Sequence, residues 1–195
     1  MSGSLLEAAF PHHVWATSRV IDACLDPSVE ELETSVLGTR GPMLETLRHV
    51  VLSDAEELFP DRQRRIRHRR RTRLAEARVI MERNGSGWAE YISRWLDADA
   101  MVLEVDKTDG YQRWAPVGFR LAQALHHGTD HRSQVCTALT TLGMEPPEID
   151  VYDFGLDTGR IVEKMPDAWR TSRVRRSGGG RESNPPGSSS PPLRF

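Results

Sequence analysis

The sequence predicts an all-α protein, in which a few amphipathic helices pack around one apolar core. Two observations indicate this class. Apolar side chains recur every three or four residues in three separate stretches, residues 14–25, 42–59 and 119–142, which is the spacing of a single helix face. Proline and glycine mark the ends of these stretches. A chain of 195 residues is long enough for one domain of ordinary size plus an appendage.

The first two helices have clear start and stop signals. Residues 14–25 form the first helix, and Pro27 lies just beyond its end. Ser28 and Glu31 have the spacing of a capping box, which opens a short helical turn. Pro42 stands at the first position of the second helix, where proline is favoured. Helical spacing of apolar residues extends this helix to Phe59.

The middle of the chain predicts shorter elements. Residues 74–83 and 88–96 have helical patterns, separated by Asn-Gly-Ser-Gly at residues 84–87, which is strong turn chemistry. Residues 101–105 and 111–114 flank Asp109-Gly110, and this arrangement predicts a small antiparallel hairpin.

The last long helix, residues 119–142, has the clearest pattern in the chain and ends at Gly143 as a C-cap. Residues 151–162 look irregular. From Arg170 onward Gly, Ser, Pro and Arg dominate, and such a segment cannot bury enough apolar surface to become ordered. We therefore expect one helical domain over residues 1–165 and a disordered basic tail over residues 166–195.

The formal net charge of −2 hides an uneven distribution. Residues 62–83 contain ten arginines against two glutamates, and residues 170–195 contain six arginines against one glutamate. A charge run of this kind is usually a solvated segment. Nucleic-acid binding through Arg64 to Arg73 is an alternative that we rank low, because no aromatic residue for base stacking lies between Arg62 and Arg83.

Neither a targeting segment nor a membrane span is evident. Residues 1–9 lack the basic and apolar regions of a signal peptide, and no run approaches the roughly 20 apolar residues of a membrane span. Two cysteines, Cys24 and Cys136, do not suggest a disulfide scaffold, so we expect reduced, buried thiols. A cytoplasmic location without a membrane partner is the resulting expectation.

Two histidines of the last long helix have the spacing of a metal-binding pair. His127 and His131 are four residues apart, so both imidazoles can reach one ion from the same helix face. On a helical wheel His131 lies within the apolar arc and His127 at its edge, whereas His126 points away and should be solvated. Ordinary hydrogen-bonded histidines could have the same spacing. Gly128 stands where zinc peptidases need a glutamate, so peptidase chemistry is not expected.

A third ligand is needed, because catalytic zinc usually has three protein ligands. The best candidate is His49, on the second helix. It lies roughly 160° from the centre of the apolar stripe of that helix. Either this second face also meets the other helices, or His49 is a surface residue, and periodicity alone favours the surface.

Four segments occur in order along the chain: VWATSRVID at residues 14–22, ETLRHVV at 45–51, LAQALHHGTDHRSQ at 121–134 and TLGMEPP at 141–147. They resemble the DinB/YfiT-like family of metalloenzymes, and the resemblance spans about residues 10–160. It implies a four-helix bundle in which helices two and three run parallel. It also implies that His49, His127 and His131 hold a divalent ion, with zinc first and nickel or iron as other candidates.

Two segments depart from the family pattern. The family usually has an amphipathic stretch where this chain has Arg62 to Arg73, and it usually ends without an Arg/Gly/Ser/Pro tail. Both departures begin abruptly. A local change of reading frame in the coding sequence is one hypothesis, and a uniform codon-position base bias throughout would contradict it.

The resemblance implies a thiol-dependent reaction. Characterised members of the family are thiol S-transferases that use a low-molecular-weight thiol such as mycothiol or bacillithiol, and thiol-dependent isomerases. A divalent ion with open positions lowers the pKa of a bound thiol or water. Transfer of a small thiol to an electrophile is therefore the leading hypothesis. The alternatives are hydrolysis of a small ester or amide, nucleic-acid binding, and a metal-stabilised bundle without catalysis.

Three further residues are candidates for supporting roles. Arg132 and Gln134 match the family motif and could position substrate, or Gln134 could hydrogen-bond a ligand imidazole. The alternative for Arg132 is a salt bridge to Asp22, Asp54 or Glu56. Glu56 could accept a proton, and the alternative is a solvated carboxylate. The expected partner is a small-molecule substrate, and a homodimer is compatible with the sequence.

Overall fold

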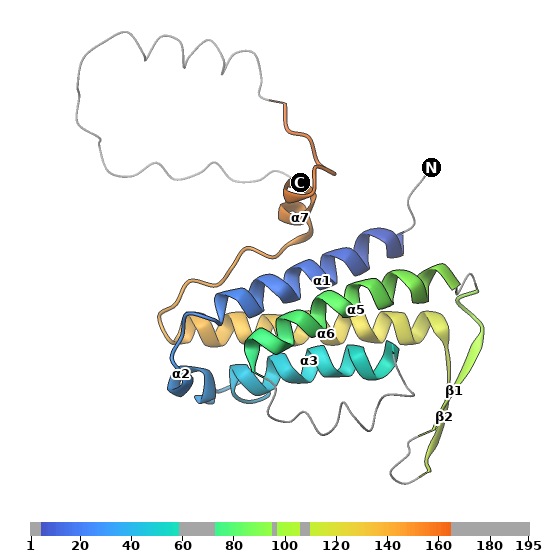
Figure 1. Cartoon of the computed structure of the whole chain (residues 1–195), viewed down its shortest axis with the longest axis horizontal. Coiled ribbons are helices and arrows are strands. Elements are labelled where there is room, and N and C mark those ends of the chain that lie inside the picture. Colours follow the sequence, from blue (N-terminus) through green and yellow to red (C-terminus); the bar gives the residue numbers. More distant parts are fainter. Residues whose placement is uncertain (1–4, 59–72, 95–96, 106–109, 165–195) are drawn as a thin grey trace. The chain divides into compact units, whose positions relative to one another are not determined.

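The structure is a computed structural model that describes residues 5–58, 73–94, 97–105 and 110–164 (Figure 1). These residues are mostly helical and include a two-stranded antiparallel sheet, which confirms the expected helical class with a small hairpin. The chain divides into two compact units, residues 1–160 and 161–195, and every helix and strand described lies in the first. The tail expected to be disordered, residues 166–195, and residues 62–72 of the arginine run lie outside the described residues.

Four of the described helices are long: α1 (Leu5–Ala23), α3 (Met43–Leu58), α5 (Leu74–Arg94) and α6 (Val117–Thr141). Two are short: α2 (Val29–Glu33) and α7 (Val151–Asp157). Strand β1 (Met101–Val105) pairs with β2 (Gln112–Pro116), so that Leu103 lies opposite Trp114. Figure 1 shows this hairpin joining the end of α5 to the start of α6.

The first helix is longer than its pattern predicts, because α1 begins at Leu5 rather than at Val14. Pro11 lies inside it, although proline removes one backbone hydrogen bond from a helix interior. Burial of Phe10 and His13 on the inner face supports the helix on both sides of this proline. The expected capping box is confirmed, since the Ser28 side chain accepts from the Glu31 backbone and the Glu31 carboxylate accepts from the Ser28 N–H.

The turn predicted at residues 84–87 is wrong, because α5 runs through it without interruption. Asn84 is buried, and its amide donates a 2.9 Å hydrogen bond to the carbonyl of Val51 on α3. Gly85 lies against Val14 of α1, where a Cβ would come within 3.2 Å of a methyl group. These two residues therefore serve contacts between helices, and packing overrides their turn propensity.

The expectation of irregular structure over residues 151–162 is also wrong in part, since α7 forms within it. The Asp150 side chain accepts a hydrogen bond from the Asp153 N–H at 2.8 Å and caps the helix. The C-cap expected after the last long helix is confirmed, because Gly143 has a φ of 78°.

Each of α1 and α3 packs against both α5 and α6, and this places the core among the four long helices. The larger apolar cluster includes Val20, Ile21, Leu47, Met81 and Leu139, and a second cluster contains Phe10, Trp88, Val117 and Leu121. Cys24 and Cys136 are free cysteines, and Cys24 is buried as expected, whereas Cys136 is only partly buried. In the described part of the chain, no helix combines the length and the apolar character that crossing a lipid bilayer requires.

Candidate metal centre

Helices α3 and α6 bring three histidines together. His49 lies on α3, and His127 and His131 lie one turn apart on α6. One nitrogen from each of the three imidazoles lies within 4.8 Å of the other two. The ring centroids are 4.5 to 5.0 Å apart, and all three side chains are half-buried. Among the described residues, this is the group of histidine, cysteine and acidic side chains with the geometry to hold a metal ion.

The surface position that periodicity favours for His49 is wrong. Helix α3 packs against two partners, α5 and α6, so its buried arc is wider than the single apolar stripe in its sequence. That arc includes the polar residues Thr46 and Asp54 as well as the apolar ones. His49 lies at the edge of α3 that faces α6, and there it meets the histidine pair. His126 is exposed, as expected.

Hydrogen bonds fix the roles of some ring nitrogens. His131 Nδ1 lies 3.1 Å from Gln134 Oε1, and the same oxygen accepts the Arg40 backbone N–H at 3.0 Å. An amide oxygen only accepts, so Nδ1 of His131 carries the hydrogen and Nε2 keeps its lone pair. Gln134 therefore holds His131 in the tautomer that coordinates a metal through Nε2. Nε2 of His127 lies 2.8 Å from Nε2 of His49.

Burial favours the neutral form of His49 and of His127. It lowers the pKa of His49 to about 4, and the positive charges of Arg40, His127 and His131 act in the same direction. Burial also lowers the pKa of His127, and the nearby carboxylate of Asp54 opposes this shift. Neutral imidazole is the form that binds metals. Imidazole nitrogens suit zinc, nickel, copper and iron, so the three residues present fit the divalent ion expected from the sequence.

Two cavities border the histidine group, one at His127 and the other at His49. One has a volume of about 300 Å³, and its lining includes His127, Asp54, Arg120 and Phe119. The other has a volume of about 940 Å³, and its lining includes His49, Arg40, Arg48 and Glu56. Ser53 lines both, so the α3 turn after His49 separates them. We call them the His127 cavity and the His49 cavity.

The other predicted site residues take different places. Gln134 hydrogen-bonds to the imidazole of His131, a candidate metal ligand, which agrees with one of its two expected roles. Glu56 lines the His49 cavity but is not part of the group of ligand atoms within 4.8 Å. Arg132 is buried, and its guanidinium donates to Thr17, Thr129 and His13. Arg132 is connected to Asp54 indirectly, because His13 hydrogen-bonds to both side chains.

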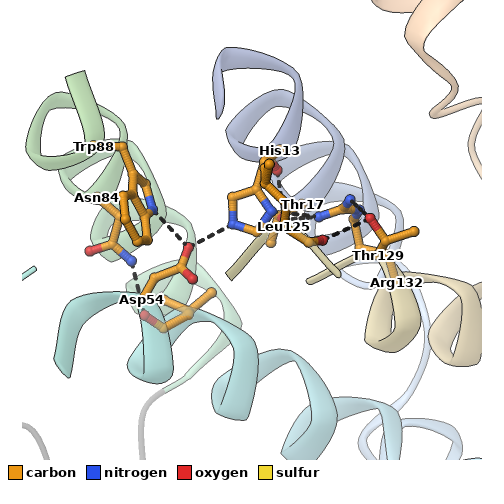
Figure 2. Close-up of polar contacts among 9 residues, drawn as sticks. His13, Thr17, Asp54, Asn84, Trp88, Leu125, Thr129 and Arg132 are labelled. Atoms are coloured by element: carbon orange, nitrogen blue, oxygen red, sulfur yellow. Dashed lines mark hydrogen bonds and ion pairs between the residues drawn. The ribbon is translucent and has the colours of Figure 1, made fainter. Parts of the chain in front are cut away.

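Sequence reasoning missed His13, which is fully buried and lies at the centre of a polar cluster (Figure 2). Its Nε2 lies 2.8 Å from Asp54 Oδ2, and the Trp88 indole N–H donates to the same oxygen at 3.3 Å. A signal was present in the sequence. Residues 13, 17, 20 and 24 continue one helix face, so His13 falls on the line of Val20 and Cys24.

The comparisons with known proteins give no relative. No protein-family model, no curated protein and no solved structure matches this chain.

Proposed function

We propose that this protein is a metal-dependent enzyme that transfers a low-molecular-weight thiol to a small electrophile. The observation that carries the proposal is the meeting of His49, His127 and His131 within 4.8 Å, at the border of two cavities. Three histidines are a typical protein ligand set of a catalytic zinc site. Such a set leaves a coordination position for a further ligand.

His49, His127 and His131 would hold the ion, with zinc the first candidate and nickel or iron next. A bound divalent ion supplies Lewis acidity and lowers the pKa of a thiol or a water. The chain supplies the arrangement of its ligands. Gln134 orients His131, and burial keeps His49 unprotonated at neutral pH.

The two cavities favour transfer between two substrates over hydrolysis of one. His127 borders one cavity and His49 the other, so a thiol and an electrophile can approach the ligands from different sides. The His49 cavity contains Arg40, Arg48 and Glu56, which suit a polar, charged thiol. The His127 cavity has apolar walls at Phe119, Ala115 and Ala124, which suit the body of a small electrophile.

We also propose that the four long helices form the DinB/YfiT-like four-helix bundle, with the second and third, α3 and α5, parallel. The packing of α1 and α3 against α5 and α6 supports this arrangement. In Figure 1 both α3 and α5 run from the α2 end toward the hairpin end, which supports the parallel direction. The motifs at residues 14–22, 45–51 and 121–134 fall on α1, α3 and α6.

The test uses the purified full-length protein, loaded with zinc and checked by elemental analysis. It is incubated with 1-chloro-2,4-dinitrobenzene and a small thiol such as mycothiol, and formation of the aryl thioether is followed by absorbance. We expect turnover that needs both metal and thiol and that His127→Ala abolishes. His126→Ala is the matched control, because this neighbouring histidine is exposed and should leave turnover unchanged.

Two other outcomes would replace the proposal. Turnover of an ester or amide without any thiol would favour the hydrolase. Equal activity in His127→Ala and the unmodified protein would remove the metal centre from the reaction. Nucleic-acid binding through the arginine run gains no structural support, because residues 62–72 lie outside the described residues.

A further inference from the structure

One buried polar cluster connects all four long helices. It contains His13 of α1, Asp54 of α3, Trp88 of α5 and Arg132 of α6 (Figure 2). His13, Asp54 and Arg132 are 0%, 2% and 3% exposed. We call these four residues the His13 bridge.

The donors and acceptors of the bridge follow one order, in which Arg132 donates to His13 and His13 donates to Asp54. A guanidinium has donors only, so Arg132 Nη1 donates to His13 Nδ1 over 3.0 Å. Nδ1 therefore carries no hydrogen, and Nε2–H of His13 donates to Asp54 Oδ2 over 2.8 Å. The Trp88 indole N–H donates to the same carboxylate oxygen. Both nitrogens of His13 are occupied by contacts within the protein, so His13 links its neighbours and is not a free base.

Charge makes this link strong. A buried cation and a buried anion are each costly unless they are paired. Burial lowers the pKa of Arg132 to about 10, with Asp54 opposing the shift, so the guanidinium is still charged at neutral pH. The Arg132–His13–Asp54 arrangement joins this cation to its counter-charge through one imidazole.

The backbone of α6 is shaped to admit His13. A Cβ on Gly128 would lie 2.2 Å from His13 Cε1 and 2.6 Å from its Nδ1, closer than real contacts allow. Glycine is therefore required at this position for the ring to reach Arg132. Gly128 directly follows His127, so the bridge contacts the backbone of α6 between the two metal-binding histidines.

Both ends of the bridge lie beside the candidate ligands. Arg132 directly follows His131 on α6, and Asp54 lies on α3 in the turn after His49. Apolar packing is non-directional, whereas hydrogen bonds constrain angle and distance. The bridge therefore fixes the rotation of α3 and α6 relative to α1, on which the meeting of the three imidazoles depends.

We infer that His13 is a positioning residue for the metal centre: without touching the ion, it holds α3 and α6 in the register at which His49, His127 and His131 converge. This inference rests on the proposed metal function. It assigns a role to a histidine, an aspartate, an arginine and a glycine that the ligand set does not explain.

The test compares three variants of the full-length protein. His13→Leu removes both hydrogen bonds and puts an apolar side chain in the place of the imidazole. His13→Gln restores one donor and one acceptor. Val20→Ala is the matched control, because Val20 is equally buried on the same helix but belongs to the apolar cluster. Zinc affinity is measured by competition with a chelator, and the visible absorption of bound Co²⁺ reports the geometry of the ligands.

We expect His13→Leu to weaken zinc affinity about tenfold to a hundredfold and to change the Co²⁺ spectrum. His13→Gln should recover most of the affinity, and Val20→Ala should keep it. Unchanged affinity and spectrum in His13→Leu would overturn the inference, as would equal losses in His13→Leu and Val20→Ala.

A second measurement is independent of metal and of any variant's folding. The imidazole ¹⁵N chemical shifts of His13 in the metal-free protein report its tautomer. A hydrogen on Nε2 supports the bridge, and a hydrogen on Nδ1 overturns it. Failure of the unmodified protein to bind zinc through His127 would instead defeat the proposed function, and the tautomer would still decide whether the bridge exists.

Discussion

The Nε2 atoms of His49 and His127 lie 2.8 Å apart, which is a hydrogen-bond distance. One of the two nitrogens therefore carries the hydrogen that the other accepts. Coordination through both requires this hydrogen to leave Nε2, and in a neutral imidazole it can move to Nδ1. This contact joins α3 to α6 at the place where an ion would join them.

Zinc should stabilise the folded protein, because the three histidines converge only in the folded state. At a free zinc concentration 100 times the dissociation constant, we expect about 2.7 kcal/mol of added stability. Thermal unfolding with zinc and with a chelator measures this gain. His49→Ala should lose it, and His126→Ala should retain it. An equal gain in both variants would mean that zinc binds elsewhere.

Gln134 should contribute to metal affinity although it is not a ligand. Its Oε1 accepts from His131 Nδ1 and from the Arg40 backbone, so it fixes the tautomer of one ligand and tethers the segment before α3. Gln134→Ala should weaken zinc binding about tenfold. Calorimetric titration measures the change. Ser133→Ala, at the exposed neighbouring position, is the control and should bind zinc like the unmodified protein.

The pair on α6 could be predicted from the sequence, whereas its partner on α3 could not be predicted from periodicity. His127 and His131 depend on local spacing within one helix, which a helical wheel captures. His49 depends on which neighbour covers the second face of α3, and that is a property of the assembled helices. The need for a third ligand made His49 a candidate, and the likeness of residues 45–51 to a known motif supported it against periodicity.

The same distinction explains the errors in the fold. The Asn84–Gly87 turn follows from local propensity, but Asn84 bonds the Val51 carbonyl and Gly85 packs on Val14, both distant in the sequence. The buried role of His13 likewise depends on partners on α3 and α6. In all three cases, Asn84, Gly85 and His13, contacts with residues distant in the sequence determine the structure.

Gly128→Ala should destabilise the protein, although alanine favours a helix over glycine by about 1 kcal/mol. The new Cβ would overlap the buried ring of His13, and overpacking of this kind typically costs about 1–3 kcal/mol. We expect a net loss, measured by urea denaturation. Gly85→Ala is the matched control in α5, because its Cβ would meet a Val14 methyl at 3.2 Å, a contact that small shifts can relieve. A more stable Gly128→Ala variant would contradict the close approach of His13.

Cys24 should make the protein less stable at alkaline pH. Burial, helped by the charge of Cys136, raises the pKa of its thiol from 9.0 to about 12. Below pH 9 the thiol is protonated in both the folded and the unfolded state, and its contribution to stability is fully present. Between pH 9 and 12 only the unfolded state loses the proton, so stability falls as pH rises, by up to about 1.4 kcal/mol per pH unit.

Cys24→Ala should remove this part of the pH dependence. The measurement is the free energy of unfolding from pH 7 to 11 for both proteins, so that the other alkaline groups cancel in the difference. Parallel curves would show that Cys24 is accessible to water in the folded state.

Asp54 and Arg132 should be energetically coupled although His13 lies between them. Asp54→Asn leaves the buried Arg132 cation without its counter-charge, and the loss of one partner of a buried pair typically costs about 3–5 kcal/mol. Arg132→Met likewise leaves the buried Asp54 carboxylate without its counter-charge. The double variant should therefore lose less than the sum of the two, with a coupling energy of about 1–3 kcal/mol from urea denaturation.

The His13→Leu background identifies the path of this coupling. If the imidazole transmits it, the coupling should fall toward zero there, since Arg132 Nη1 and Asp54 Oδ2 both bond to His13. The exposed Arg78–Glu82 pair, joined at 2.7 Å, is the control and should give no more than about 0.5 kcal/mol. Coupling between Asp54 and Arg132 that is unchanged by His13→Leu would mean that the two charges interact directly through the core.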